Sequence, residues 1–101
     1  MINSKVKGRK GEAEVENILR AHGFETKHSG WHEGPDIVCR YEGQDEPTTI
    51  EVKRKNIGSS SIYEELKEAD EVWHRANGQD WMVTVKAKNY LALRLLAKGT
   101  P

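Results

Sequence analysis

The chain has 101 residues, of which 36% are hydrophobic and 32% are charged, which suits one domain with one small core. No apolar run is long enough to span a bilayer, and the basic N-terminus lacks the apolar region of a secretory signal. The one cysteine, Cys39, cannot form an internal disulfide and fits a reducing compartment. We therefore expect a cytoplasmic protein with no membrane association.

The sixteen basic and sixteen acidic side chains cancel in number but are segregated along the chain. Acids concentrate between residues 64 and 80, and every charged residue after Asp80 is basic. Two basic clusters could contact phosphates; they contain Lys5, Lys7, Arg9 and Lys10, and Lys53, Arg54 and Lys55. An ordinary solvated surface would carry the same charges, so both interpretations stand at this point.

The first half of the chain predicts one helix and three strands. Apolar residues recur at helical spacing over residues 8–22, and Gly23 can end that helix. A short strand follows at 24–28, and a loop rich in glycine separates it from the next strand, 36–41. A turn then leads to a third strand, 48–54.

The second half predicts a helix over 62–76, a strand over 81–85 and a helix over 89–97. The apolar residues expected to face inward are Ile62, Leu66, Ala69 and Trp73 in the first helix, and Leu91, Leu95 and Leu96 in the second. The order α-β-β-β-α-β-α indicates an α/β domain with a small central mixed sheet flanked by helices.

The two strands 36–41 and 48–54 bring acidic and basic side chains together if they form a hairpin. The expected register sets Asp36 opposite Lys53 and diagonal to Glu51, with all three on one face. A slip of one residue would place Asp36 beside Ile50 and Val52, and their apolar alternation disfavours it.

Two neighbouring carboxylates repel one another unless a cation or a proton intervenes. Magnesium uses one or two carboxylates and leaves positions for water and phosphate oxygens. An adjacent lysine can orient a water or stabilise charge on a phosphate, which suits phosphodiester hydrolysis. The alternative is an exposed ion pair between Asp36 and Lys53, worth about 0.2–1 kcal/mol.

Glu12 adds a third acid, on or beside the inward face of the helix over 8–22. A carboxylate there is costly unless it is paired or faces a metal. The first turn of a helix also favours an acid, so a purely structural role is the alternative.

Taken together, Glu12 in a helix, Asp36 within Gly-Pro-Asp, and the run Glu51-Val52-Lys53 resemble the PD-(D/E)xK nuclease superfamily. Residues 5–57 are most similar to the archaeal-type Holliday-junction resolvases. The resemblance implies a restriction-endonuclease-like fold and one nuclease domain over residues 1–101, with residues 1–7 as a flexible basic arm.

The resemblance also implies a metal site. Asp36 and Glu51 would bind Mg²⁺, for which Mn²⁺ would substitute. The Val52 carbonyl would be a further ligand, and Glu12 would touch the metal through water. Lys53 would position or activate the attacking water.

Other residues are assigned by the same resemblance. Ser29 matches a serine that assists catalysis in some members. The phosphate contacts would come from Lys5, Lys7, Arg9, Lys10, Arg54 and Lys55, without base readout. The acidic segment from Glu64 to Glu71 should lie away from DNA or at the rim of a dimer.

The implied function is a magnesium-dependent, structure-selective endonuclease. It would act as a homodimer and resolve four-way DNA junctions by paired symmetric nicks. Another nuclease of the superfamily, acting on linear, flap or single-stranded DNA, is the first alternative. A non-catalytic DNA-binding module is the second, and the four intact residues Glu12, Asp36, Glu51 and Lys53 argue against it.

Overall fold

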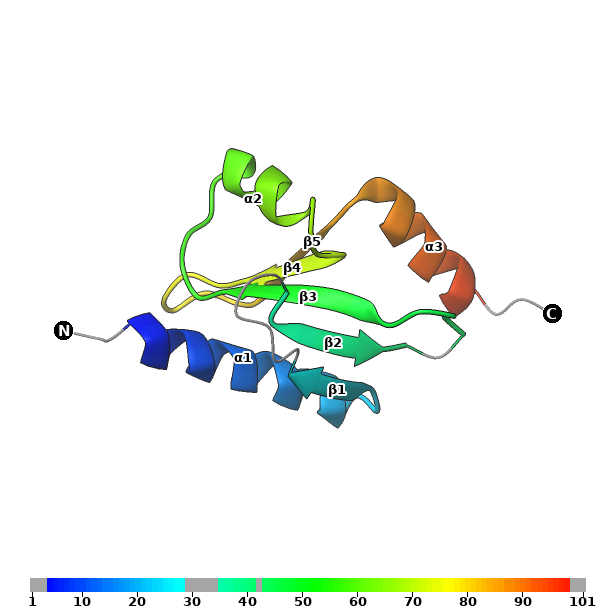
Figure 1. The fold of residues 1–101 in the computed structure, drawn as a ribbon, viewed down its shortest axis with the longest axis horizontal. Coiled ribbons are helices and arrows are strands. Elements are labelled where there is room, and N and C mark those ends of the chain that lie inside the picture. Colours follow the sequence, from blue (N-terminus) through cyan, green and yellow to red (C-terminus); the bar gives the residue numbers. More distant parts are fainter. Residues whose placement is uncertain (1–3, 29–34, 42, 99–101) are drawn as a thin grey trace.

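The computed structural model describes residues 4–28, 35–41 and 43–98, which form a five-stranded sheet with three helices. In chain order the elements are α1 (Ser4–Ala21), β1 (Glu25–His28), β2 (Ile37–Arg40), β3 (Thr48–Lys53), α2 (Ser59–Glu65), β4 (Glu71–His74), β5 (Met82–Val85) and α3 (Ala87–Ala97). The strands lie in sequence order, and β3 and β4 are parallel while the other neighbours are antiparallel (Figure 1). The predicted α/β class with a mixed sheet is confirmed.

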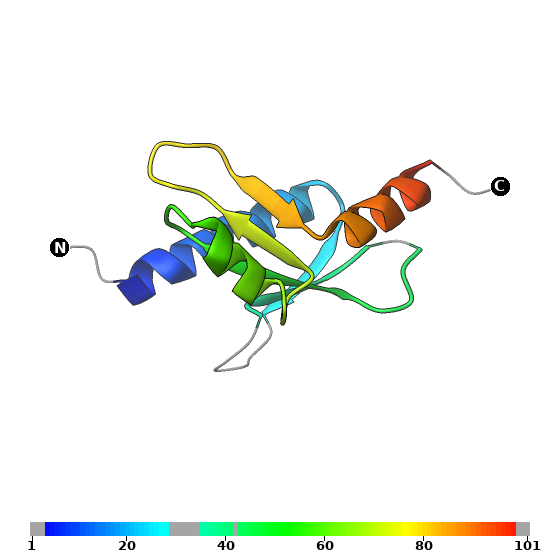
Figure 2. The ribbon, with the colours of Figure 1, turned by 90° about the horizontal axis from the view of Figure 1, so that it is seen from above.

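Helix α1 covers one face of the sheet, and this contact forms the main core (Figures 1 and 2). Alternate residues of β2 and β3 point to α1, as the apolar alternation of those strands predicts. The buried side chains are Val15, Leu19, Ile37, Cys39, Ile50 and Val52.

The opposite face is only partly covered. Helix α2 and the segment after it lie over β3 and β4, where Leu66, Ala69 and Val72 are buried (Figures 1 and 2). On β1 and β2, by contrast, Lys27 and Arg40 are exposed on this face.

The predicted helix over 62–76 is wrong. The helix ends at Glu65, and residues 71–74 form strand β4. Val72 and Trp73 suit a strand, and β3 offers β4 a complete parallel ladder from Ile50 to Lys53. A partner distant in sequence therefore overrides the helical spacing of the apolar residues.

Two further expectations need correction. Helix α1 begins at Ser4, so residues 4–7 are helical and do not belong to the expected arm over residues 1–7. Helix α3 buries none of its residues, and the leucines expected to face inward, Leu91, Leu95 and Leu96, are 57%, 62% and 36% exposed. Within the described segments, no helix is both long enough and apolar enough to cross a membrane.

A buried carboxylate lies on the α1 face of β4. Glu71 is only 4% exposed. Its Oε1 accepts hydrogen bonds from the Tyr41 hydroxyl at 3.2 Å and from Trp73 Nε1 at 2.9 Å. Burial raises the pKa of Glu71, and the two hydrogen bonds oppose that rise only in part.

Candidate functional site

Asp36 lies where the hairpin of β2 and β3 begins. Its backbone N–H donates to the Ile50 carbonyl at 2.9 Å, and its Oδ2 accepts from the Val52 N–H at 2.9 Å. The observed register pairs Ile37 with Ile50, which sets Asp36 opposite Glu51 and not opposite Lys53 as predicted. Because the difference is two residues, the three side chains keep the predicted common face.

Lys53 is held between two carboxylates on the face away from α1. Its Nζ lies 3.4 Å from Glu51 Oε1 on the same strand and 3.3 Å from Glu65 Oε1 on α2. The side chains of Glu51 and Lys53 are 12% and 27% exposed, so the pair is largely shielded from water. The acidic segment from Glu64 to Glu71 was expected to lie away from DNA or at the rim of a dimer. Its residue Glu65 nevertheless contacts Lys53.

Glu12 reaches the same region from α1. Its Oε2 lies 2.7 Å from Nε2 of His28, the last residue of β1. The hydrogen bond to Glu12 raises the pKa of His28, and the charges of Glu12 and the neighbouring acids add to that effect. Glu12 also lies close enough to Asp36 for its charge to raise the pKa of that carboxyl.

The pKa values show that negative charge is crowded here. Burial, followed by the charge of Asp36, raises the pKa of Glu51 to about 7, while the charge and hydrogen bond of Lys53 oppose that rise. Burial also raises the pKa of Asp36, with Glu12 adding to the rise and the Val52 N–H opposing it. Desolvation lowers the pKa of Lys53, but Glu51 and Glu65 outweigh it, so Lys53 stays protonated.

The donor set fits a hard divalent cation. Asp36 and Glu51 are adjacent oxygen donors with more negative charge than Lys53 balances, which is the environment that magnesium relieves. Among the described residues, no three His, Cys, Asp or Glu side chains are grouped so that they could hold a metal together. Magnesium needs only one or two carboxylates, so the Asp36–Glu51 pair is sufficient, and Glu12 is engaged with His28.

The residues predicted to contact phosphates differ in their exposure to solvent. Arg9, Lys10 and Lys55 are exposed. Arg54 is half-buried, and its guanidinium donates to the Arg75 carbonyl at 3.0 Å. Its stem packs on Gly11 of α1, where an added Cβ would lie 2.3 Å from the Arg54 Cγ. The side chains of Lys5 and Lys7, and all of Ser29, lie outside what the structure describes.

Sequence reasoning missed two residues of this region, His28 and Glu65. His28 was not among the predicted site residues, although its place at the end of a predicted strand, beside the loop before Asp36, was a usable signal. Glu65 had no such signal, because its contact with Lys53 depends on the crossover between β3 and β4.

Comparison with known proteins supports the architecture. No known family model matches the sequence, and no curated protein matches it. The structure is similar to that of Hjc, a Holliday junction resolvase from the archaeal hyperthermophile Archaeoglobus fulgidus, with a TM-score of 0.57. The two share 20% sequence identity, and the match covers 78% of this chain and 72% of the other. A likeness at this identity concerns the fold.

Proposed function

We propose, starting from the fold that the chain shares with a Holliday junction resolvase, that it is a DNA endonuclease that resolves four-way junctions. The observation that carries this proposal is the cluster of Asp36, Glu51 and Lys53, with Glu12 reaching the same place from α1. Two carboxylates beside a protonated lysine suit the hydrolysis of a phosphodiester.

In this proposal Asp36 and Glu51 hold a magnesium ion, with the Val52 carbonyl as a further ligand. Bound there, magnesium would polarise a phosphate oxygen and lower the pKa of a water. Lys53 serves as a cation and hydrogen-bond donor, because its flanking acids keep it protonated; it orients the attacking water or neutralises charge on the phosphate. Glu12 is held by His28 at the edge of the site, and Ser29 assists catalysis.

Substrate binding is assigned to the basic residues on either side of the site. The proposed phosphate contacts are Lys5, Lys7, Arg9, Lys10, Arg54 and Lys55. Of these, Arg54 has the smaller role, because its guanidinium is engaged with the Arg75 carbonyl.

We also propose a homodimer, because a two-fold junction needs two active sites. Its surface is supplied by α3, whose Leu91 and Leu95 are 57% and 62% exposed on a helix that buries none of its residues. Replacing Leu95 with Glu should convert a dimer to a monomer in analytical ultracentrifugation. A wild-type chain that stays monomeric at high concentration would contradict this part of the proposal.

The deciding experiment is cleavage of a labelled four-way junction with Mg²⁺ or Mn²⁺, beside linear duplex, flap and single-stranded DNA. We expect the wild type to place paired symmetric nicks in the junction only. Asp36→Asn should not cut, and Lys53→Ala should cut far more slowly while still binding the junction. Cleavage of linear or flap DNA would assign another nuclease substrate, and binding without any cleavage would leave a DNA-binding module.

A further inference from the structure

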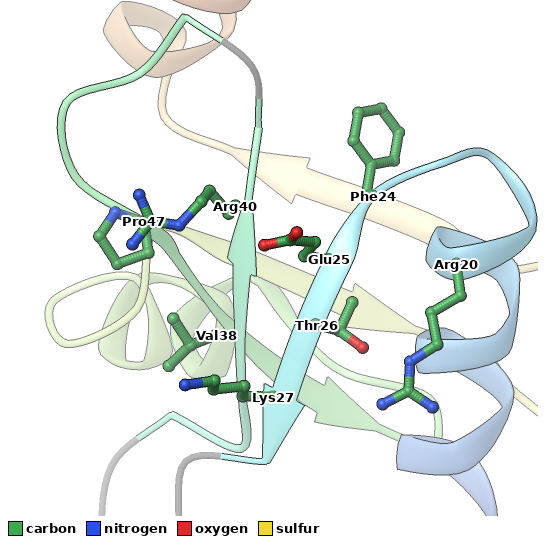
Figure 3. Close-up of a pocket in the computed structure, with 8 residues that line it drawn as sticks. All are labelled: Arg20, Phe24, Glu25, Thr26, Lys27, Val38, Arg40 and Pro47. Atoms are coloured by element: carbon green, nitrogen blue, oxygen red, sulfur yellow. The ribbon is translucent and has the colours of Figure 1, made fainter.

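Two exposed cations, Lys27 and Arg40, lie on the same face of the sheet as the acid cluster. Residues two apart on a strand share a face, so Asp36, Val38 and Arg40 form one row along β2. Lys27 of β1 lies beside that row, because it pairs with Val38. Figure 3 shows the Lys27, Val38 and Arg40 side chains on one side of β1, where they line a hollow of about 770 Å³.

One carboxylate lies near these cations: Glu25 of β1 is directly opposite Arg40 and lines the same hollow. Within the described ranges, neither Lys27 nor Arg40 forms an ion pair with a carboxylate, whereas Arg20, Lys53, Lys67 and Arg75 all do. Lys27 and Arg40 are diagonal neighbours across the two strands, an arrangement that puts like charges within reach of one another. Because Glu25 forms no ion pair with either cation in the described residues, both remain available to bind an anion.

The distance from the acid cluster suits a nucleic acid strand. Asp36 and Arg40 are four residues apart, which is about 13 Å along an extended chain. One strand of B-DNA advances about 3.4 Å per nucleotide along the axis, so this length corresponds to roughly four nucleotides. Among the described residues, α2 lies over β3 and β4, and Lys27 and Arg40 are exposed, so no described element blocks a strand that leaves the acid cluster over β2 and β1.

We propose that Lys27 and Arg40 bind the phosphate backbone of the DNA strand that enters the Asp36–Glu51 cluster. The path of that strand thus runs over the open face of β2 and β1. This inference rests on the proposed nuclease function and adds residues outside the two basic clusters of the sequence. Their role is to position the strand, without reading its sequence.

The test is the binding of a fluorescently labelled four-way junction, followed by anisotropy in EDTA so that no cleavage takes place. The double variant Lys27→Ala/Arg40→Ala removes two contacts from exposed positions, and circular dichroism verifies its fold. Each lost contact should lower the salt slope by about 0.9, so the loss of affinity between 50 and 200 mM salt should be about tenfold smaller than for the wild type.

Arg20→Ala provides the matched control. Arg20 lines the same hollow but points to the other side of β1, and it is paired with Glu16 at 3.7 Å (Figure 3). We expect its affinity and salt slope to equal those of the wild type. An unchanged double variant, or an equal loss in Arg20→Ala, would overturn the inference.

The binding assay also separates this inference from the proposed function. If the wild type cuts junctions and the double variant binds and cuts equally well, only the strand path is wrong. If the wild type cuts no DNA but the double variant loses salt-dependent binding, the path stands and the nuclease function fails. A wild type that binds no DNA would overturn both.

Discussion

Asp36 accepts a hydrogen bond of 2.9 Å from the backbone N–H of Val52, the residue between Glu51 and Lys53. The carboxylate therefore holds the hairpin in register while it contributes charge to the site. The two roles can be separated experimentally, because an amide oxygen can accept the same hydrogen bond without carrying the charge.

Asp36→Asn and Asp36→Ala should both lose cleavage but differ in stability. Asn keeps an acceptor for the Val52 N–H, whereas Ala leaves that donor unpaired at a cost of about 1–3 kcal/mol. Urea unfolding measures the difference, and junction binding should be kept or tightened in Asp36→Asn because negative charge near phosphate is reduced. Loss of binding in step with loss of cleavage would contradict the assignment of Asp36 to the metal.

The pKa of Glu51, about 7, predicts that magnesium binding depends on pH. The cation binds the ionised carboxylate, so its apparent affinity should rise between pH 6 and pH 8, by at most about tenfold per unit below pH 7. Titration calorimetry at several pH values measures this. Glu51→Gln should bind magnesium weakly at every pH, and a wild-type affinity that does not change with pH would refute the prediction.

The same shift predicts how magnesium stabilises the fold. The folded pKa of Glu51 lies above the ordinary value of 4.5, so without a cation its stabilising contribution is complete below pH 4.5. That contribution is lost as the pH rises through about 7. Added magnesium should therefore raise the Tm more at pH 8 than at pH 5.5. An equal rise at both values would show that Glu51 is not the titrating ligand.

The parts of the site that follow local patterns could be predicted from sequence. The alternation of Ile50 and Val52 determines which face Glu51 and Lys53 take, and the structure agrees. The register of the hairpin was missed by two residues, since Asp36 lies opposite Glu51. The two-residue period of side chains along a strand determines which face of the sheet each residue occupies. Which residues lie opposite one another depends in addition on the number of residues in the connecting turn.

The parts that depend on distant partners could not be predicted. Residues 66–73 have apolar residues at helical spacing, yet the parallel ladder with β3 makes Glu71–His74 a strand. The contact between Lys53 and Glu65 follows from the same crossover. The leucines of α3 recur at helical spacing, which predicts the helix correctly. That spacing does not show whether the rest of the chain buries the apolar face of the helix, and in α3 no residue is buried.

Gly11 should be sensitive to substitution because Arg54 lies against it. A Cβ at residue 11 would be 2.3 Å from the Arg54 Cγ, so Gly11→Ala should destabilise the fold by about 1–3 kcal/mol despite the better helix propensity of alanine. In the double variant with Arg54→Ala, most of that cost should disappear. Urea unfolding of the four proteins measures the coupling, and strictly additive costs would show that the two residues do not conflict.

Glu71 should make stability fall as the pH rises. Its pKa is raised by burial, so its stabilising contribution is complete below about pH 4.5 and is lost as the pH rises through the folded value. Glu71→Gln can keep both hydrogen bonds, because the Tyr41 and Trp73 donors share one oxygen, so its advantage over the wild type should grow from pH 5 to pH 8.

Chemical denaturation at several pH values measures this advantage. As a control, Glu71→Leu loses both acceptors and should be less stable than Glu71→Gln throughout, by roughly 1–3 kcal/mol for each donor left unpaired. A constant difference between Glu71→Gln and the wild type would mean that Glu71 does not titrate in this range.

The two edges of the sheet have unequal protection against unwanted strand pairing. The edge strand β1 carries charged residues, among them Glu25 and Lys27, which discourage another chain from adding to it. The other edge strand, β5, reads Met-Val-Thr-Val without a charge, and Met82 and Val83 are 60% and 47% exposed. Aggregation during heating or concentration should therefore start at β5, which makes it the strand to alter when a more tractable protein is wanted.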